Sequence, residues 1–103
     1  MYFSKIFRIK EGKLDTFKDW MSQLNGPRKE EATATFAYEH VTREVFALFK
    51  GSDGHHYVIG LNEASDLRPG DPDVPINQEH NAIKRECLEP FSESGEVLLD
   101  LSV

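Results

Sequence analysis

Two residues with acid–base side chains, His80 and Glu44, fall on largely apolar faces of an expected helix and an expected strand. His80 shares its helix face with Ile76, Ile83 and Cys87. An imidazole among apolar neighbours can serve as a general acid or base, because burial tunes its pKa. The same placement also fits a core histidine that only hydrogen-bonds to the backbone or to a carboxylate. We take His80 as the first candidate catalytic residue and keep the structural role as the alternative.

Glu44 is the second candidate catalytic residue, and it shares its strand face with Phe46. On the next strand, His55 and Tyr57 share a face in the same way. If these faces border one uncovered space, then Tyr57, Phe46 and His55 are candidate ligand-binding residues of a small apolar pocket. The alternative is a cross-strand polar pair at the edge of a sheet.

Metal binding is not expected, because the histidines and the cysteine lack the spacing of a metal site. His55 and His56 are neighbours on a strand, so their side chains point to opposite faces. The sequence has no Cys-x-x-Cys and no His-Glu-x-x-His motif. Cys87 is the sole cysteine, so it has no intrachain disulfide partner and favours a reducing compartment. We expect neither a metal nor another cofactor.

The strongest local signal that must position these groups is a β-hairpin over residues 43–63. Two runs rich in β-branched and aromatic residues flank a Gly-Ser-Asp-Gly turn at residues 51–54. Both faces of both strands are largely apolar, whereas a half-solvated antiparallel sheet has one polar face. Helices of the same chain can cover only one face. We therefore expect a second subunit or a ligand on the other.

Apolar periodicity predicts the remaining elements on either side of the hairpin. Trp20 lies within an apolar helical stripe and is expected in the core. The alternating Ala-Thr-Ala-Thr run at 32–35 leaves a strand as the alternative to a helix there. Besides the hairpin, the expected elements are a strand at 2–10, a helix at 13–24, a second helical piece at 27–38, a long irregular loop at 64–76, a helix at 77–89 with Asn77 as N-cap, and a last strand at 96–103.

This order predicts a single α+β domain over residues 1–103. The arrangement is β-α-β-β-α-β, the ferredoxin-like order, with a four-stranded antiparallel sheet and helices on one face. The net charge of −6 disfavours nucleic acid and anionic membranes as partners, because both require many Lys and Arg residues. The apolar run at the N-terminus carries charges, so it predicts neither a signal peptide nor a membrane span. The expected location is the cytoplasm.

Three stretches resemble a known superfamily: the helical segment Glu30–Thr35, the hairpin strand Glu44–Phe49, and the pair Glu79-His80. In these stretches the chain resembles the dimeric α+β barrel superfamily, and more narrowly a small uncharacterised bacterial family of that architecture. The superfamily includes cofactor-independent antibiotic-type monooxygenases and rhamnose-type sugar mutarotases. The resemblance implies a ferredoxin-like subunit that forms a homodimer through its open sheet face.

Two functional hypotheses follow from these observations. The first is a small-molecule site beside the sheet or at the dimer interface, with isomerase-like or cofactor-free monooxygenase-like chemistry at His80 and Glu44. The second is a non-catalytic homodimeric interaction module whose apolar sheet face is simply an interface. The sequence alone does not identify the ligand.

Overall fold

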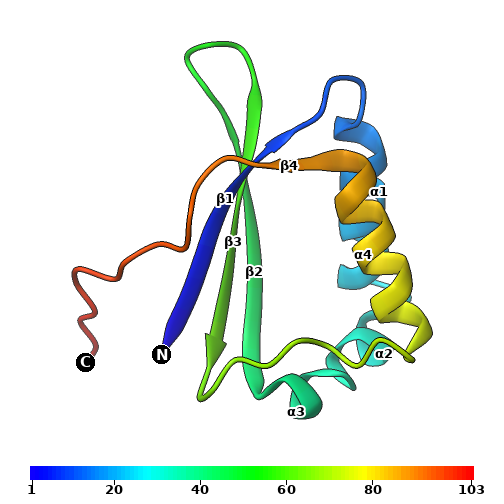
Figure 1. Cartoon of the computed structure of the whole chain (residues 1–103), viewed down its shortest axis with the longest axis vertical. Helices are drawn as coiled ribbons and strands as arrows, with labels where there is room; N and C mark the ends of the chain where they lie inside the picture. The colour runs from blue at the N-terminus through cyan, green and yellow to red at the C-terminus, as the bar shows by residue number, and fades with distance from the viewer.

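A computed structural model describes all 103 residues and shows an α+β fold, with an open four-stranded antiparallel sheet and helices packed against one face (Figure 1). The strand order is β2-β3-β1-β4. None of the helices is both long and apolar enough to cross a membrane. The elements are β1 (Tyr2–Ile9), α1 (Leu14–Asn25), α2 (Lys29–Thr33), α3 (Phe36–Glu39), β2 (Val41–Lys50), β3 (His56–Ala64), α4 (Pro75–Cys87) and β4 (Leu88–Pro90).

The predicted hairpin is confirmed as the pair β2–β3. Val45 lies opposite Leu61, and the register continues to the turn. The backbone N–H of Gly51 donates to the carbonyl of His55 over 2.8 Å and closes the loop. Gly54 has a φ of 85°, a conformation that a residue with a side chain rarely adopts. The glycine at this position is thus what the reversal requires.

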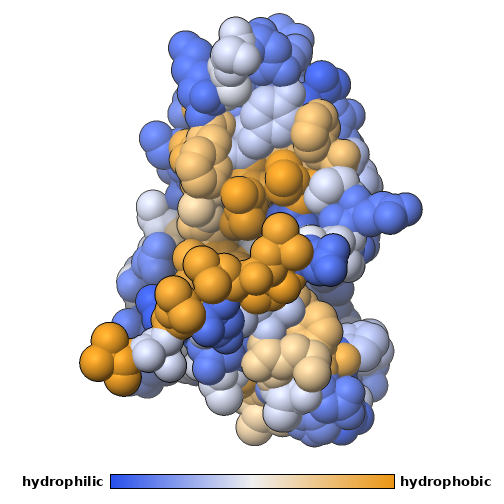
Figure 2. Space-filling view, turned by 90° about the vertical axis from the view of Figure 1, so that its left-hand side faces the viewer, coloured by the Kyte–Doolittle hydropathy of each residue, from blue (hydrophilic) through white to orange (hydrophobic).

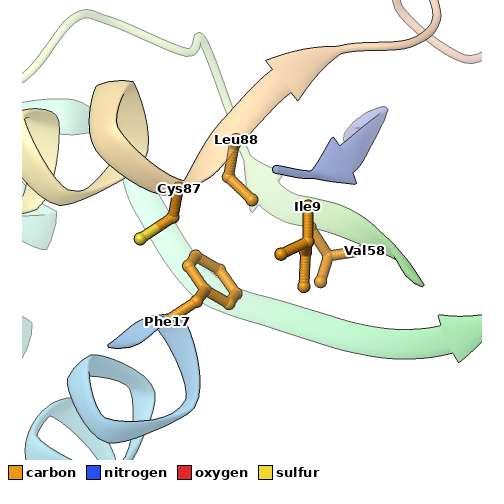
Figure 3. Packing of buried hydrophobic residues seen from close by; sticks show 5 residues of the cluster. All are labelled: Ile9, Phe17, Val58, Cys87 and Leu88. Atoms are coloured by element: carbon orange, nitrogen blue, oxygen red, sulfur yellow. The ribbon is translucent and has the colours of Figure 1, made fainter. Parts of the chain in front are cut away.

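The core lies between the sheet and helices α1 and α4 (Figure 3). Phe17 of α1 and Cys87 of α4 meet Ile9, Val58 and Leu88 from the strands, and all five side chains are buried. Trp20 and Ile76 are also buried, at 4% and 3% exposure. The two apolar helix stripes predicted from the sequence therefore face the sheet, as expected.

The segment after α1 is helical, so the strand alternative for residues 32–35 is wrong. It forms two short helices, α2 and α3, instead of one continuous helix. At the break, the hydroxyl of Thr35 donates to the carbonyl of Ala32 over 2.7 Å. His40 ends α3 in the left-handed conformation, with a φ of 60°, and β2 begins at the next residue. This tight junction places α3 directly beside the start of β2.

Helix α4 begins two residues earlier than predicted, and Asn77 is not its N-cap. Val74 is the N-cap residue and Pro75 occupies the first turn, where its missing N–H and fixed φ are favourable. The Asn77 amide instead donates to the carbonyl of Asp71 over 3.0 Å. The helix ends at Cys87, because Leu88 turns extended and pairs with Ile9 as part of β4.

The predicted last strand at residues 96–103 is wrong. The fourth strand is the short β4, and the chain beyond it has no regular structure. Residues 91–95 occupy the free edge of β1: Phe91 and Ser92 donate backbone N–H bonds to Ile6, and Gly95 donates to Ser4. No backbone hydrogen bond holds residues 96–103, so their alternating apolar pattern lacks a strand to pair with.

One face of the sheet carries no helix, and apolar side chains gather across it (Figure 2). The C-terminal segment 96–103 passes over part of this face and leaves a hollow of about 540 Å³. Leu98 and Leu101 of the segment are 86% and 82% exposed. The hollow is lined by Tyr2, Arg43, Val45, Leu61, Glu63, Val97, Leu99, Asp100 and Leu101.

The predicted irregular stretch at 64–76 is largely confirmed, since no helix or strand lies between Ala64 and Pro75. Two backbone bonds attach it to α3: Ser65 donates to the carbonyl of His40, and Arg68 donates to that of Glu39. The stretch therefore runs beside α3 before it reaches α4.

Candidate functional site

A cavity of about 40 Å³ lies where α1, α2, α3 and α4 meet the start of β2. We call it the inner cavity. Half of its lining residues are apolar and the rest include two carboxylates, an amide and an imidazole. Its lining residues are Leu24, Ala32, Thr35, Phe36, Glu39, Val41, Glu44, Ile76, Asn77 and His80.

A wider outer cleft of about 540 Å³ adjoins the inner cavity. Leu24, Ala32, Phe36 and Glu44 line both spaces, so Glu44 stands where the two meet. The outer cleft runs along β2 beneath α1 and α2. Its other lining residues are Met21, Asn25, Lys29, Thr33, Thr42, Arg43, Val45 and Phe46. Its volume lies in the range of small-molecule sites.

His80 is held by aromatic neighbours on two sides. Its Nδ1 accepts a hydrogen bond from the indole Nε1–H of Trp20 over 2.8 Å, and the two rings stack with their centroids 6.1 Å apart. The ring of Phe46 meets it edge-on at 6.3 Å. Burial, together with a smaller effect of the nearby charge of Lys84, lowers the pKa of His80 to about 4. At neutral pH His80 is therefore an uncharged imidazole.

The pKa of Glu44 is shifted upward, in contrast to that of His80. The residue as a whole is exposed, yet it lines both the inner cavity and the outer cleft, so part of it is enclosed by protein. This partial burial raises the pKa of Glu44; Lys84 opposes the shift and Glu39 adds to it. A carboxylate with a raised pKa is a stronger base than a free one.

The guanidinium group of Arg28 lies over the indole ring of Trp20. Its Cζ lies 5.3 Å from the centre of the indole ring. Its Nη1 donates to Glu79 over 2.9 Å and its Nη2 donates to Glu31 over 2.8 Å. The arginine thereby links α4 to the start of α2 and covers the indole that contacts His80.

The ring of Phe46 packs closely over the opposing residue on β3, which has no side chain. Gly60 lies opposite Phe46, and a Cβ built on it would come 3.1 Å from the phenyl ring. The same ring contacts Phe17 edge-on at 6.0 Å. Phe46 therefore packs against the core cluster and also forms part of the wall of the outer cleft.

Of the five site residues proposed from the sequence, the structure brings together His80, Glu44 and Phe46. Tyr57 lies on the opposite face of the sheet, because its neighbour Val58 points into the core. The expectation that Glu44 and Tyr57 line one face is therefore wrong.

Tyr57 and His55 belong to the turn end of the hairpin. The hydroxyl of Tyr57 donates to the carboxylate of Asp53, and its ring packs against Phe91 at 4.8 Å. The backbone of His55 donates to Asp53 as well, over 2.9 Å, and its side chain is exposed. Neither residue lines the inner cavity or the outer cleft.

Sequence reasoning missed Trp20 as a polar partner, and it did not place Glu39, Asn77 or Arg28 at the site. Trp20 was expected only as core. One signal was available: the indole N–H of a buried tryptophan usually has an acceptor, and His80 is a polar group on the facing helix. No group of three or more His, Cys, Asp or Glu side chains is placed to hold a metal ion.

In the comparison with known families, one family model matches nearly the whole chain. Residues 4–103 match the model of a family described as a family of unknown function, DUF6176. The chain belongs to this family. No curated protein and no solved structure matches the chain. Membership in the DUF6176 family gives the inner cavity no assigned ligand, so its chemistry must be argued from the side chains themselves.

Proposed function

We propose that this member of the DUF6176 family binds a small molecule in the inner cavity and outer cleft and catalyses an isomerase-like proton transfer on it. The observation that carries this proposal is one pair of residues. Glu44 and His80 line the same cavity, and burial shifts their pKa values in opposite directions. In both residues burial favours the uncharged form, and pKa values perturbed by burial beside a cavity are a common feature of acid–base sites.

The step assigned to this pair is proton removal next to a carbonyl group. The Glu44 carboxylate takes the proton from the carbon, and the C–H electron pair forms the C=C bond of an enolate. The uncharged His80 donates a hydrogen bond to the enolate oxygen, which carries the developing negative charge. Return of the proton from Glu44 to the same or the neighbouring carbon completes an exchange or an isomerisation. This chemistry favours the isomerase-like hypothesis over the monooxygenase-like one.

A thermal-shift screen tests ligand binding. The panel contains sugars, phenols, hydroxyketones, aromatic acids and aromatic amines, applied to wild type, Glu44→Gln and His80→Gln. A compound at ~100 times its Kd stabilises the protein by about 2.7 kcal/mol. The matched control is His55→Gln, because His55 lies outside both spaces. The proposal fails if no compound stabilises wild type, or if every shift survives in Glu44→Gln and His80→Gln.

Proton transfer is tested separately in D₂O. NMR follows the loss of the α-proton signal of each carbonyl compound that stabilises wild type in the screen, during incubation with the protein. We expect Glu44→Gln to slow this exchange at least 100-fold, within the range that general-base catalysis contributes. Equal exchange with wild type and Glu44→Gln would remove the catalytic part of the proposal and leave the binding part standing.

The second candidate function is the homodimeric interaction module, and the open sheet face is the observation that favours it. This face is largely apolar, and the segment 96–103 carries the strand-like pattern Val97, Leu99, Leu101 without a backbone partner. We propose that a second copy covers the face in the manner of a dimeric α+β barrel. The strand order and the one-sided helices support a ferredoxin-like subunit for such a dimer.

Sedimentation equilibrium tests the dimer. Leu99→Asp places a charge in the hollow over the open face and is expected to weaken association at least tenfold. Leu98→Asp is the matched control, because Leu98 is 86% exposed and does not line that hollow. A monomeric wild type at high protein concentration, or equal effects of both substitutions, would contradict this candidate.

A further inference from the structure

We propose that Trp20 holds His80 as a neutral imidazole with its proton on Nε2, so that the cleft selects an uncharged, largely apolar ligand with a carbonyl oxygen beside a hydroxyl group. This inference rests on the proposed function, because it names the ligand class of the same site. It also makes a claim about the free protein, namely the position of one proton. That claim can be tested without any ligand.

The position of the proton follows from the chemistry of the indole. The Nε1–H of a tryptophan is a hydrogen bond donor only. It lies 2.8 Å from Nδ1 of His80, so Nδ1 must present its lone pair. The proton of the neutral ring then resides on Nε2. Protonation of Nδ1 would break this bond and leave two donors facing each other, which adds to the effect of burial in keeping the ring uncharged.

The indole itself is fixed in place. Trp20 is only 4% exposed and is, with Phe17, one of the two buried residues of α1. Arg28 lies over its outer face, and Glu79 and Glu31 hold that guanidinium through charge-assisted hydrogen bonds. Rotation of the indole away from His80 would have to displace this arrangement. The orientation of the histidine is therefore built into the packing of α1 against α4.

The free Nε2–H defines what the inner cavity offers to a ligand. His80 lines the cavity, and its Nε2 has no hydrogen bond partner within the protein. A ligand must therefore present an acceptor to this position. Glu44 and Glu39 face the same space and accept hydrogen bonds, so the ligand should also present a donor. A carbonyl oxygen next to a hydroxyl group meets both requirements with adjacent atoms.

The charges in the wall and the volumes of the two spaces narrow the class of ligand further. Glu39 and Glu44 lie in the wall, so an anionic ligand would be repelled, although Lys84 on α4 reduces this effect. The same carboxylates would attract a cationic ligand, but an ammonium group has no acceptor for the Nε2–H of His80, which would stay unpaired. The inner cavity of about 40 Å³ has room only for a small polar group, whereas the outer cleft of about 540 Å³ has room for an apolar body.

The proton position is tested first, by ¹⁵N NMR of histidine-labelled free protein at pH 7. We expect the His80 shifts of the Nε2–H tautomer in wild type, and a mixture of both tautomers in Trp20→Phe, which keeps the aromatic packing but loses the donor. A wild-type His80 in the Nδ1–H form or in the charged form overturns the inference, whether or not any ligand binds.

The ligand class is tested with four aromatic compounds of similar size. We expect 2-hydroxyacetophenone, which has both groups, to bind at least tenfold tighter than mandelate, acetophenone or phenethylamine. The fluorescence of Trp20, the sole tryptophan, reports binding. Tighter binding of mandelate or of phenethylamine, or equal binding of acetophenone, overturns the inference and leaves the proposed function intact. If none of the four binds, the ligand class is wrong, and the broader screen decides the proposed function separately.

Discussion

The indole Nε1–H of Trp20 donates a hydrogen bond to Nδ1 of His80 over 2.8 Å, and this bond joins α1 to α4. The two residues are 60 positions apart in the chain. A contact that belongs to the packing of two helices thus also determines which nitrogen of the candidate catalytic residue faces the cavity. Stability and chemistry are coupled at this point, and the following predictions test the coupling and its surroundings.

Acidification should destabilise the protein through His80. The pKa of His80 is about 4 in the folded state, against an ordinary value of 6.5. The unfolded chain therefore binds more protons between these pH values, and the free energy of unfolding falls as the pH drops from about 6.5 to about 4. The loss should reach up to about 3 kcal/mol. Urea denaturation at several pH values measures it.

Two variants serve as controls for this prediction, and in each the free energy of unfolding is measured against pH. His80→Phe lacks the titrating group and should show a flatter profile between pH 6.5 and 4.5. Glu44 has a raised pKa, so it favours the folded state at low pH and partly offsets the effect of His80. Glu44→Gln should therefore steepen the profile. An unchanged slope in His80→Phe would contradict the burial described for this ring.

Val58 should be among the most sensitive positions in the sheet. Its side chain is 1% exposed and contacts the core cluster, so Val58→Ala removes buried volume that the neighbours cannot easily refill. We expect a loss of about 2–3 kcal/mol in the free energy of unfolding. Val45→Ala, the same change on the open face, should cost less than about 1 kcal/mol at low protein concentration. Equal losses would place the core on the wrong side of the sheet.

Removing the guanidinium of Arg28 should lower the melting temperature and make it less sensitive to salt. Arg28→Ala loses the bonds to Glu79 and Glu31 and exposes the indole beneath. Arg28→Lys keeps the charge but not the planar, forked geometry, so it should recover only part of the loss. A double-mutant cycle with Glu79→Gln isolates the Arg28–Glu79 pair. Additive effects in that cycle would show that the pair makes no contribution.

The thiol of Cys87 should be unreactive while the protein is folded. The residue is 0% exposed, and burial raises the pKa of its thiol, so little thiolate is available to attack a reagent. A disulfide reagent such as Ellman's reagent should label it at the rate of unfolding, and at once in denaturant. Rapid labelling of the native protein, matching that of a small free thiol, would contradict the burial at the end of α4.

Local periodicity was enough to predict most elements of this fold. The stripe of α1 with Phe17 and Trp20, and the alternation around Val58, depend on neighbouring residues in the chain and were confirmed. The strand predicted at 96–103 was wrong because pairing is a competition between distant segments. Residues 91–95 already use the free backbone groups of β1 near Ile6 and Ser4, and no local pattern reveals that.

The candidate site was less predictable than the fold. His80 and Glu44 stood out as polar groups on largely apolar faces, and this reasoning placed both in one cavity region. Tyr57 was wrongly grouped with them. The sequence of a single strand does not show how it pairs with its neighbours or which of its two faces the helices cover. The contact between Trp20 and His80 depends on how α1 lies against α4, a relationship that neither helix sequence contains by itself.

The phenyl ring of Phe46 lies over Gly60, and a Cβ at position 60 would come so close, 3.1 Å, that the ring would have to shift. Positions 46 and 60 therefore form a pair that should co-vary across the DUF6176 family. Where position 60 acquires a methyl group or more, position 46 should carry a smaller side chain, since the sum of the two volumes is what this part of the sheet can hold. The outer cleft would then be wider, and the pair would set how bulky a ligand each relative can admit.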